Sequence, residues 1–228
     1  MKTLHLLTKL ERYPLFTEND VAKIVNKSPE YVKTLLYRLN KQNIVKRIEK
    51  GKYTVYDDPM LFASHIVAPS YLSLWTAFRF YSMTQQQPFG IFVISRVNKK
   101  KLKFQNIDIL FSKTKHLFGY KKERYADFDI FIAEEEKAVV DALLFKIPLQ
   151  DIMYALESEK LNFEKLAVYA KKTNNRSLIK RLGYILEAKK GKNYGLRALD
   201  NNYIPLDYLN KKKGRKDRVW KLIINTKL

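Results

Sequence analysis

The stretch SPEYVKTLLYRLNK, residues 28–41, predicts a helix with a well-marked beginning. Ser28 can accept a hydrogen bond as the N-cap residue, and Pro29 suits the first helical position because no N–H is needed there. Apolar residues then recur at i, i+3, i+4 and i+7, namely Val32, Leu35, Leu36 and Leu39. This spacing predicts one buried helix face, and therefore one face turned to solvent.

The solvent face of this helix carries side chains that suit DNA. Lys33, Arg38 and Lys41 are candidates for phosphate or guanine contacts. Thr34 and Tyr37 suit a thymine methyl group or a phosphate, and Glu30 could accept a hydrogen bond from cytosine. With the N-terminal Ser28, the candidate contacts on the helix are Ser28, Glu30, Lys33, Thr34, Tyr37, Arg38 and Lys41.

Two further helical patterns precede this segment. The first runs through Leu4 and Leu10 and ends near Pro14, and the second starts after Thr17, an N-cap residue with Asp20 in a capping-box position. The second pattern stops at Asn26-Lys27, a polar turn that accommodates a left-handed residue. Two short helices joined by a tight turn form the helix-turn-helix layout, in which the second helix enters the major groove.

A hairpin is predicted to follow the helices. The β-prone runs 44–48 and 53–56 flank a turn at 49–52 that contains Gly51. Three helices and a basic hairpin predict a winged helix-turn-helix over residues 1–57, with wing contacts from Arg47, Lys50 and Lys52 to phosphates or the minor groove. The alternative is a packing module or a protein-binding winged helix without DNA contacts.

Residues 58–228 predict a larger α+β domain with an antiparallel sheet and a helical subdomain. The expected boundary lies at Asp57-Asp58-Pro59. Ser70 is expected to cap a helix from Tyr71 to about Met83. Later β-prone runs cover residues 91–95, 101–111, 117–123, 127–132 and 218–224, and helical patterns cover 133–144, 149–156, 162–171 and 177–188.

The charge of the chain favours a polyanionic partner. Its 228 residues contain 44 Lys and Arg against 23 Asp and Glu, a formal net charge of +21. The excess is spread along the chain, with dense clusters at residues 99–103, 189–192 and 211–216. For these clusters, a DNA backbone and an acidic protein face both remain open.

Several classes of protein conflict with this composition. The absence of Cys excludes disulfides, thiolate metal sites and a cysteine nucleophile, and the three histidines stand apart at no metal-ligand spacing. No apolar run approaches the roughly 20 residues that a membrane span needs, and the N-terminus lacks a signal-peptide pattern. A cytoplasmic protein without a membrane partner or a cofactor is therefore expected.

One pattern leaves an enzymatic alternative open. Asp127 and Asp129 share a strand face, and Glu135 and Lys137 follow as E-x-K, an arrangement typical of Mg²⁺-dependent nucleases. The same residues are common as surface charges at a strand edge and a helix start. No phosphate-binding glycine loop accompanies them, so the expectation is a protein without enzymatic activity.

Several segments occur together in the order of a known family. They are PSYLSLWTA at 69–77, FDIFIAEEEKAVVD at 128–141, NRSLIKRLGYILE at 175–187, YIPLD at 203–207 and RVWKLIIN at 218–225. With the N-terminal module, they make nearly the whole chain similar to the AbiEi family of antitoxins from type IV toxin–antitoxin (abortive infection) systems.

The resemblance implies a function for each part of the chain. The winged helix would repress transcription by binding inverted repeats in its own promoter, and the C-terminal domain would act as the antitoxin. The cognate toxin of that family is a nucleotidyltransferase-like protein, which need not form a stable complex. By this resemblance, Glu136, Lys137 and Asp141 are architectural. A stand-alone regulator, or an interaction module that masks an acidic partner, remains the alternative.

Overall fold

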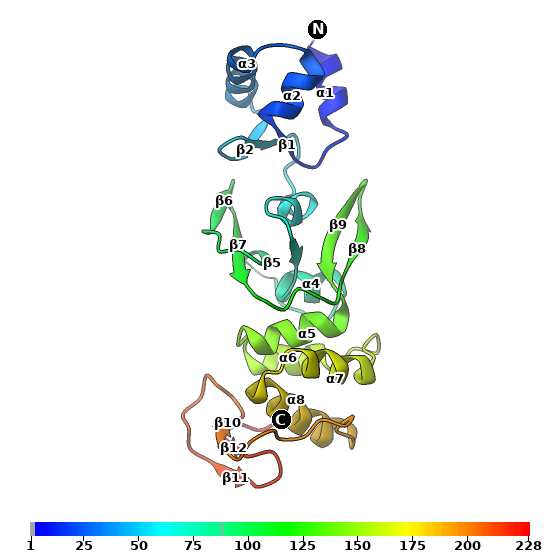
Figure 1. Cartoon of the computed structure of the whole chain (residues 1–228), viewed down its shortest axis with the longest axis vertical. Helices are drawn as coiled ribbons and strands as arrows, with labels where there is room; N and C mark the ends of the chain where they lie inside the picture. The colour runs from blue at the N-terminus through cyan, green and yellow to red at the C-terminus, as the bar shows by residue number, and fades with distance from the viewer. Residues whose placement is uncertain (1–2, 88) are drawn as a thin grey trace. The chain divides into compact units, whose positions relative to one another are not determined.

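The computed structural model describes residues 3–87 and 89–228, which form a mixed α+β structure with several sheets (Figure 1). The chain divides into two compact units. The first contains residues 3–72, 89–117 and 121–132, and the second contains residues 73–87, 118–120 and 133–228. The boundary expected at residue 57 is not among the boundaries of these units.

Three helices open the first unit: α1 (Thr3–Leu10), α2 (Glu18–Val25) and α3 (Pro29–Lys41). The predicted capping box is present, because the Thr17 hydroxyl accepts from the Asp20 N–H at 3.3 Å while the Asp20 carboxylate accepts from the Thr17 N–H at 2.8 Å. Asn26 ends α2 in the left-handed region, at φ 51°. Ser28 caps α3 by accepting from the N–H of Tyr31, so these predicted boundaries are confirmed.

A three-stranded sheet packs with these helices, in the order β1 (Phe16–Thr17), β3 (Lys52–Thr54) and β2 (Lys46–Glu49). The β2–β3 turn contains Gly51 at φ 77°, a conformation that glycine adopts without steric cost. Strand β1 was not expected, because two residues are too few to give a strand pattern in the sequence. The core between the helices and the sheet contains Leu6, Leu10, Phe16, Val21, Val32, Leu36, Leu39, Val45 and Tyr53.

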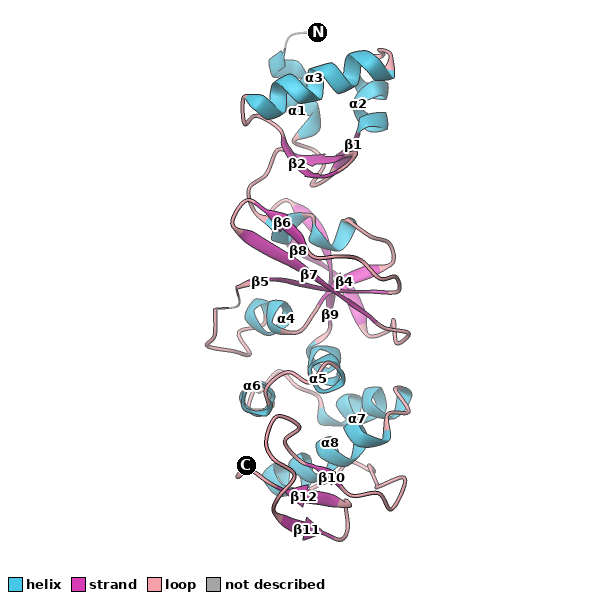
Figure 2. Cartoon of the chain, turned by 90° about the vertical axis from the view of Figure 1, so that its left-hand side faces the viewer, coloured by secondary structure: helices cyan, strands magenta, loops and turns pink. Residues whose placement is uncertain are grey.

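A six-stranded sheet completes the first unit, in the order β6-β7-β5-β4-β9-β8. Figure 2 shows these strands in one twisted sheet. Their bounds are β4 (Ser70–Leu72), β5 (Gly90–Ser95), β6 (Leu102–Phe104), β7 (Ile107–Lys113), β8 (Tyr120–Tyr125) and β9 (Phe128–Ala133). Short 3₁₀ helices at Pro59–Leu61 and Ala63–His65 precede β4.

The expectation of an antiparallel sheet is wrong for this six-stranded sheet. Strands β4 and β9 run parallel, as do β5 and β7, whereas β4–β5 and β6–β7 are antiparallel. The pair β4–β9 joins strands distant in sequence, whereas β5 and β7 are parallel because the short strand β6 lies between them in the chain. The sequence of each strand does not encode which other strand lies beside it.

The expected helix over residues 71–83 is also corrected. Ser70–Leu72 form the central strand β4, and the helix α4 is shorter, at Trp75–Phe80. Tyr71 and Leu72 are both fully buried although they face opposite sides of the sheet. Consecutive apolar residues occur both in a buried central strand and in a buried helix, and periodicity alone does not distinguish them.

The second unit is mainly helical. Besides α4, it contains α5 (Glu135–Leu144), α6 (Leu149–Ala155), α7 (Phe163–Lys172) and α8 (Arg176–Lys190). Helix α5 contacts the other four. Asn162 and Asn175 cap α7 and α8 by accepting backbone N–H bonds. A small sheet follows, with β12 (Leu222–Ile224) between β10 (Ile204–Pro205) and β11 (Arg215–Asp217).

Gly183 of α8 is the point where Trp220 packs against the helix. A Cβ atom at this position would lie 2.0 Å from Cη2 of Trp220, whose side chain is among the largest that are fully buried. We expect Gly183→Ala to destabilise the protein by about 2 kcal/mol, because the overpacking exceeds the gain in helix propensity.

Thermal unfolding measures this effect, as a midpoint lowered by roughly 4–8 °C for a chain of this size. The additional substitution Trp220→Phe removes the clashing ring atoms and should recover part of the loss. An unchanged midpoint in Gly183→Ala would contradict the packing described here.

In the part of the chain that the structure describes, no helix combines the length and the apolar character needed to cross a bilayer.

Candidate nucleic-acid interface

The outward face of α3 is solvent-exposed along its whole length. Val32, Leu36 and Leu39 are 0–3% exposed and fix the opposite face on the core. All the candidate contacts on this helix are exposed: Ser28, Glu30, Lys33, Thr34, Tyr37, Arg38 and Lys41. Tyr37 is 62% exposed and the neighbouring Tyr31 51%, which is unusual for large rings. The structure therefore brings the predicted contacts on α3 together on one open face.

The cations of this face form no ion pair with the acidic side chains that the structure describes. In residues 3–87 and 89–228, no ion pair involves Lys33, Arg38 or Lys41. The ammonium of Lys41 lies 5.5 Å from the ring centroid of Tyr37, a weak cation–π contact at an exposed site. The face is therefore positively charged and ready to pair with an external anion.

The N-terminal end of α3 is held by local hydrogen bonds. The Thr34 hydroxyl donates to the carbonyl oxygen of Glu30 at 3.1 Å. Hydrogen bonds from its own backbone N–H and from the Ser28 side chain, with the nearby Lys33 ammonium, lower the pKa of the exposed Glu30 carboxyl. A charged Glu30 is repelled by phosphate, so an amino-group donor such as that of cytosine is the partner it suits.

The three predicted wing cations differ in their surroundings. Arg47 and Lys50 are exposed, and Nε of Arg47 donates to the carbonyl oxygen of Glu49 at 3.4 Å. Lys52 is only half-exposed, and its ammonium pairs with the Glu49 carboxylate at 3.0 Å and donates to the carbonyl oxygen of Ile66. Arg47 and Lys50 are therefore the wing cations open to a ligand in this arrangement.

Glu49 links the β2–β3 hairpin to the rest of the first unit. Its carboxylate accepts a hydrogen bond from Lys99 at 2.7 Å as well as the one from Lys52. Partial burial raises the pKa of Glu49, but the bonds from Lys99 and Lys52 outweigh it and leave that pKa below its ordinary value. Lys99 belongs to a basic cluster in the sequence, and nothing in the sequence indicated that its partner is in the wing.

Further contacts hold the segment that follows β3. The Tyr125 hydroxyl donates to the Asp58 carboxylate at 2.7 Å, and Gln105 donates to Asp57. The rings of Tyr56 and Phe128 meet edge to face with centroids 5.2 Å apart. The segment after the β2–β3 hairpin is therefore fixed within the first unit rather than forming a free linker.

We expect the double substitution Arg47→Ala/Lys50→Ala to weaken duplex binding similarly for specific and unrelated sequences. If both side chains contact phosphates, the log–log salt slope should fall in magnitude by about 1.8. The measurement is a set of binding isotherms at several salt concentrations. Lys52→Ala should change the slope less, because Lys52 is already paired, and an equal or larger change would refute this difference between the wing cations.

Asp129, one carboxylate of the nuclease alternative, already has local partners. Asp129 pairs with Lys122 at 2.8 Å and with Arg124 at 3.7 Å, and these cations lower its pKa. Asp127 is exposed, while Lys137 is fully buried and bonded to Asp141. Among the described residues, no group of three or more His, Asp or Glu side chains is placed to hold a metal ion.

The second unit contains a buried polar cluster, of which the sequence predicts only that Lys137 and Asp141 lie one helical turn apart. It consists of Lys137, Asp141 and Ser73, each 0% exposed. The Lys137 ammonium pairs with one carboxylate oxygen of Asp141, and the Ser73 hydroxyl donates to the other at 2.9 Å. Burial lowers the pKa of Lys137, although Asp141 acts in the opposite direction. The i, i+4 spacing was visible in the sequence, but the role of Ser73 was not.

Neither known protein-family models nor curated proteins match this chain.

Proposed function

We propose that this protein is a DNA-binding transcriptional repressor of its own promoter and the antitoxin of a type IV toxin–antitoxin pair. In this proposal, residues 3–57 form a winged helix-turn-helix. Helices α2 and α3 are the helix-turn-helix pair, and the β2–β3 hairpin is the wing. The operator would contain inverted repeats, each read by one copy of α3.

The observation that carries the DNA-binding part is the exposed, unpaired cationic face of α3. The helix has 13 residues and is therefore roughly 20 Å long, which suits insertion into the major groove. Within the described residues its cations form no ion pair, although Glu30 lies near Lys33, whereas Lys52 and Lys137 each pair with a carboxylate. A face of this composition binds phosphates and guanine edges without first breaking internal ion pairs.

The position of each α3 residue along the helix would decide whether it contacts base edges or the DNA backbone. Glu30, Lys33 and Thr34 lie near the N-terminal end, which approaches the base edges in helix-turn-helix complexes. Tyr37, Arg38 and Lys41 lie one or two turns later, where the helix runs past the sugar–phosphate backbone. Arg47 and Lys50 would add phosphate contacts from the wing.

The antitoxin role rests on the resemblance of nearly the whole chain to AbiEi antitoxins. The C-terminal part would oppose a nucleotidyltransferase-like toxin, without requiring a stable complex with it. Residues 58–228 carry +15 of the formal charge, so an acidic partner is the specific alternative for this part. The protein would perform neither role as an enzyme and would need no cofactor or metal.

The test is binding to the DNA upstream of its own gene. Mobility-shift and footprinting experiments with the full chain should show protection of inverted repeats, and a promoter–reporter fusion should be repressed when the chain is supplied. Binding no tighter than to unrelated DNA of equal length, with no repression, would overturn the regulatory role.

The antitoxin role has a separate test. Co-expression should restore growth to cells that produce a nucleotidyltransferase-like protein encoded beside this gene. Repression without growth rescue would favour a stand-alone regulator. Capture of an acidic neighbour in a complex that withstands washing would favour the masking alternative.

A further inference from the structure

The β2–β3 hairpin carries one acidic residue among its exposed cations. Glu49 is the last residue of β2, two positions after Arg47 and directly before Lys50. Arg47 and Lys50 are the exposed residues that would contact DNA phosphates in the proposed function. Because like charges repel each other even in water, an uncompensated Glu49 carboxylate would weaken the binding that these two cations provide.

Two ammonium groups compensate this carboxylate. Nζ of Lys99 lies 2.7 Å from Oε2 of Glu49, and Nζ of Lys52 lies 3.0 Å from Oε1, so each oxygen has its own cation. All three side chains are partly buried, and salt screens partly buried pairs much less than exposed ones. Partial burial raises the pKa of Glu49, but the two cations outweigh it, so the carboxylate is ionised at neutral pH and neutralised by its partners.

One of these partners, Lys99, comes from outside the hairpin. It lies between β5 and β6 of the six-stranded sheet, 50 residues further along the chain than Glu49. Strand β6 contacts β2, which brings this part of the sheet to the hairpin. The ammonium of Lys99 also lies 5.7 Å from the ring centroid of Phe111 in β7. The sheet therefore supplies a cation that is already held beside the Glu49 carboxylate.

The position of Glu49 is coupled to that of Arg47. The pairing of β2 with β3 shifts register between these two residues, and such an irregularity re-aims the side chains of the strand. Nε of Arg47 donates to the carbonyl oxygen of Glu49 at 3.4 Å, so the guanidinium group stays close to this residue. A phosphate that pairs with Arg47 would therefore lie near Glu49, and the charge of Glu49 matters for the affinity.

We propose that Lys99 is a positioning residue of the DNA interface, which acts by neutralising Glu49 and does not itself contact DNA. With the carboxylate neutralised, Arg47 and Lys50 pair with phosphates without opposition from their own hairpin. The six-stranded sheet thereby supports DNA binding through one internal ion pair. This inference rests on the proposed DNA-binding function, and it separates Lys99 from the other lysines of the cluster at residues 99–103.

The test is a double-mutant cycle in the full-length chain, with the DNA upstream of its gene and an unrelated duplex of equal length as probes. Lys99→Gln should weaken binding to both duplexes about fivefold, because the Glu49 carboxylate then repels phosphates. Glu49→Gln alone should change the affinity less than about twofold, because its charge is already neutralised. In Lys99→Gln/Glu49→Gln the affinity should return to within about twofold of the parent, so the two effects are not additive.

Lys101 provides a matched control from the same cluster. Its ammonium pairs with the Asp108 carboxylate of β7 at 3.0 Å, so it has an acidic partner as Lys99 has, but outside the hairpin. Lys101→Gln should therefore leave DNA binding unchanged. Thermal midpoints of all variants show whether they fold as the parent does. Recovery of affinity by the second substitution is a result that a purely structural role of Lys99 would not give.

Three results would overturn the proposal. Equal weakening by Lys99→Gln in the parent and in the Glu49→Gln background would mean that Lys99 contacts DNA itself. An equal loss in Lys101→Gln would mean that only the general charge matters. The third is unchanged binding in Lys99→Gln while Arg47→Ala/Lys50→Ala binds more weakly.

The proposed function fails in a different way, since Arg47→Ala/Lys50→Ala would then bind as the parent does. If Lys99→Gln alone lowers the thermal midpoint, the double variant is compared with Glu49→Gln, because neither contains an unpaired carboxylate. Affinities within about twofold of each other support the proposal, and clearly weaker binding by the double variant overturns it.

Discussion

Replacing Lys33, Tyr37 and Arg38 together by alanine is expected to weaken operator binding at least 100-fold. Each copy of α3 on an inverted repeat would lose one base contact, at Lys33, which contributes about 1–3 kcal/mol of discrimination, and two backbone contacts, at Tyr37 and Arg38. The total loss over the two copies is therefore expected to be roughly 3 kcal/mol or more. The effect should be larger for the operator than for unrelated DNA, because the base contacts are specific whereas phosphate contacts are not. Mobility shifts at fixed salt with both DNAs measure the two effects.

The fold should survive this change. All three side chains are exposed, while the core face of α3 at Val32, Leu36 and Leu39 is untouched. Alanine also has the highest helix propensity, and the cation–π pair that the substitution removes, Tyr37 with Lys41, is weak because it is exposed. The thermal midpoint of the triple variant should therefore stay close to that of the parent.

A matched control distinguishes the loss of sequence-specific contacts by α3 from the loss of positive charge alone. Arg79→Ala/Tyr154→Ala/Lys189→Ala removes the same three residue types from exposed positions of the second unit. The control should keep its preference for the operator. If the α3 variant binds the operator as tightly as the parent while folding normally, α3 is not the reading helix.

Asp141→Asn is expected to cause the largest loss of stability, about 3–5 kcal/mol. Asparagine keeps the shape of the side chain and still accepts the hydrogen bond from Ser73. It removes the counter-charge of Lys137, however, whose ammonium is completely buried. Urea unfolding followed by circular dichroism measures the free energy of unfolding.

Removing the whole polar cluster should be less harmful than removing one charge. The triple variant Ser73→Ala/Lys137→Met/Asp141→Leu leaves no buried charge, and we expect it to recover most of the stability lost in Asp141→Asn. An Asp141→Asn variant as stable as the parent would refute the role of this ion pair, and so would a triple variant as unstable as a destabilised Asp141→Asn.

The pH dependence of stability provides an independent readout. Burial lowers the pKa of Lys137 below its unfolded value of 10.5. Between the folded and the unfolded pKa, the unfolded chain binds more protons, so this group makes stability rise with pH in that window. Asp141 raises the pKa of Lys137, so Asp141→Asn should extend the window to lower pH, whereas the triple variant should lack this contribution.

The local structure of the N-terminal helices could be predicted because capping residues act over a few positions. Thr17 with Asp20, Asn26, and Ser28 with Pro29 all lie where the sequence places them. Strand order in the larger sheet could not be predicted in this way. It depends on which distant strands meet, and β4, at the centre, has the consecutive apolar residues that a buried helix also has.

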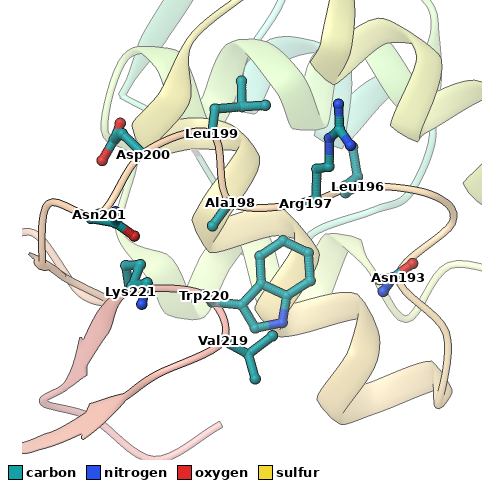
Figure 3. Close-up of a pocket in the computed structure, with 10 residues that line it drawn as sticks. All are labelled: Asn193, Leu196, Arg197, Ala198, Leu199, Asp200, Asn201, Val219, Trp220 and Lys221. Atoms are coloured by element: carbon teal, nitrogen blue, oxygen red, sulfur yellow. The ribbon is translucent and has the colours of Figure 1, made fainter.

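In the candidate site, too, local features could be predicted from the sequence, whereas contacts with distant residues could not. Exposure of the α3 residues follows from helical periodicity, so the open face could be predicted from the apolar positions alone. The surroundings of Lys52 could not, because its partners include the carbonyl oxygen of Ile66 and a carboxylate shared with Lys99. The pocket of about 440 Å³ between the loop 193–201 and the segment 219–221 (Figure 3) was also missed, since residues 193–201 lack regular structure and carry no periodic signal.

The division of the chain into two units has a consequence for its synthesis. The chain passes from one unit to the other after residues 72, 87, 117, 120 and 132. Strand β9, which pairs with the central β4 at Leu72 and Ile132, comes last in the first unit. On the ribosome, this sheet therefore stays open until residue 132 has left the exit tunnel. By then, residues 73–87 of the second unit have already emerged, ahead of the helices that will cover them.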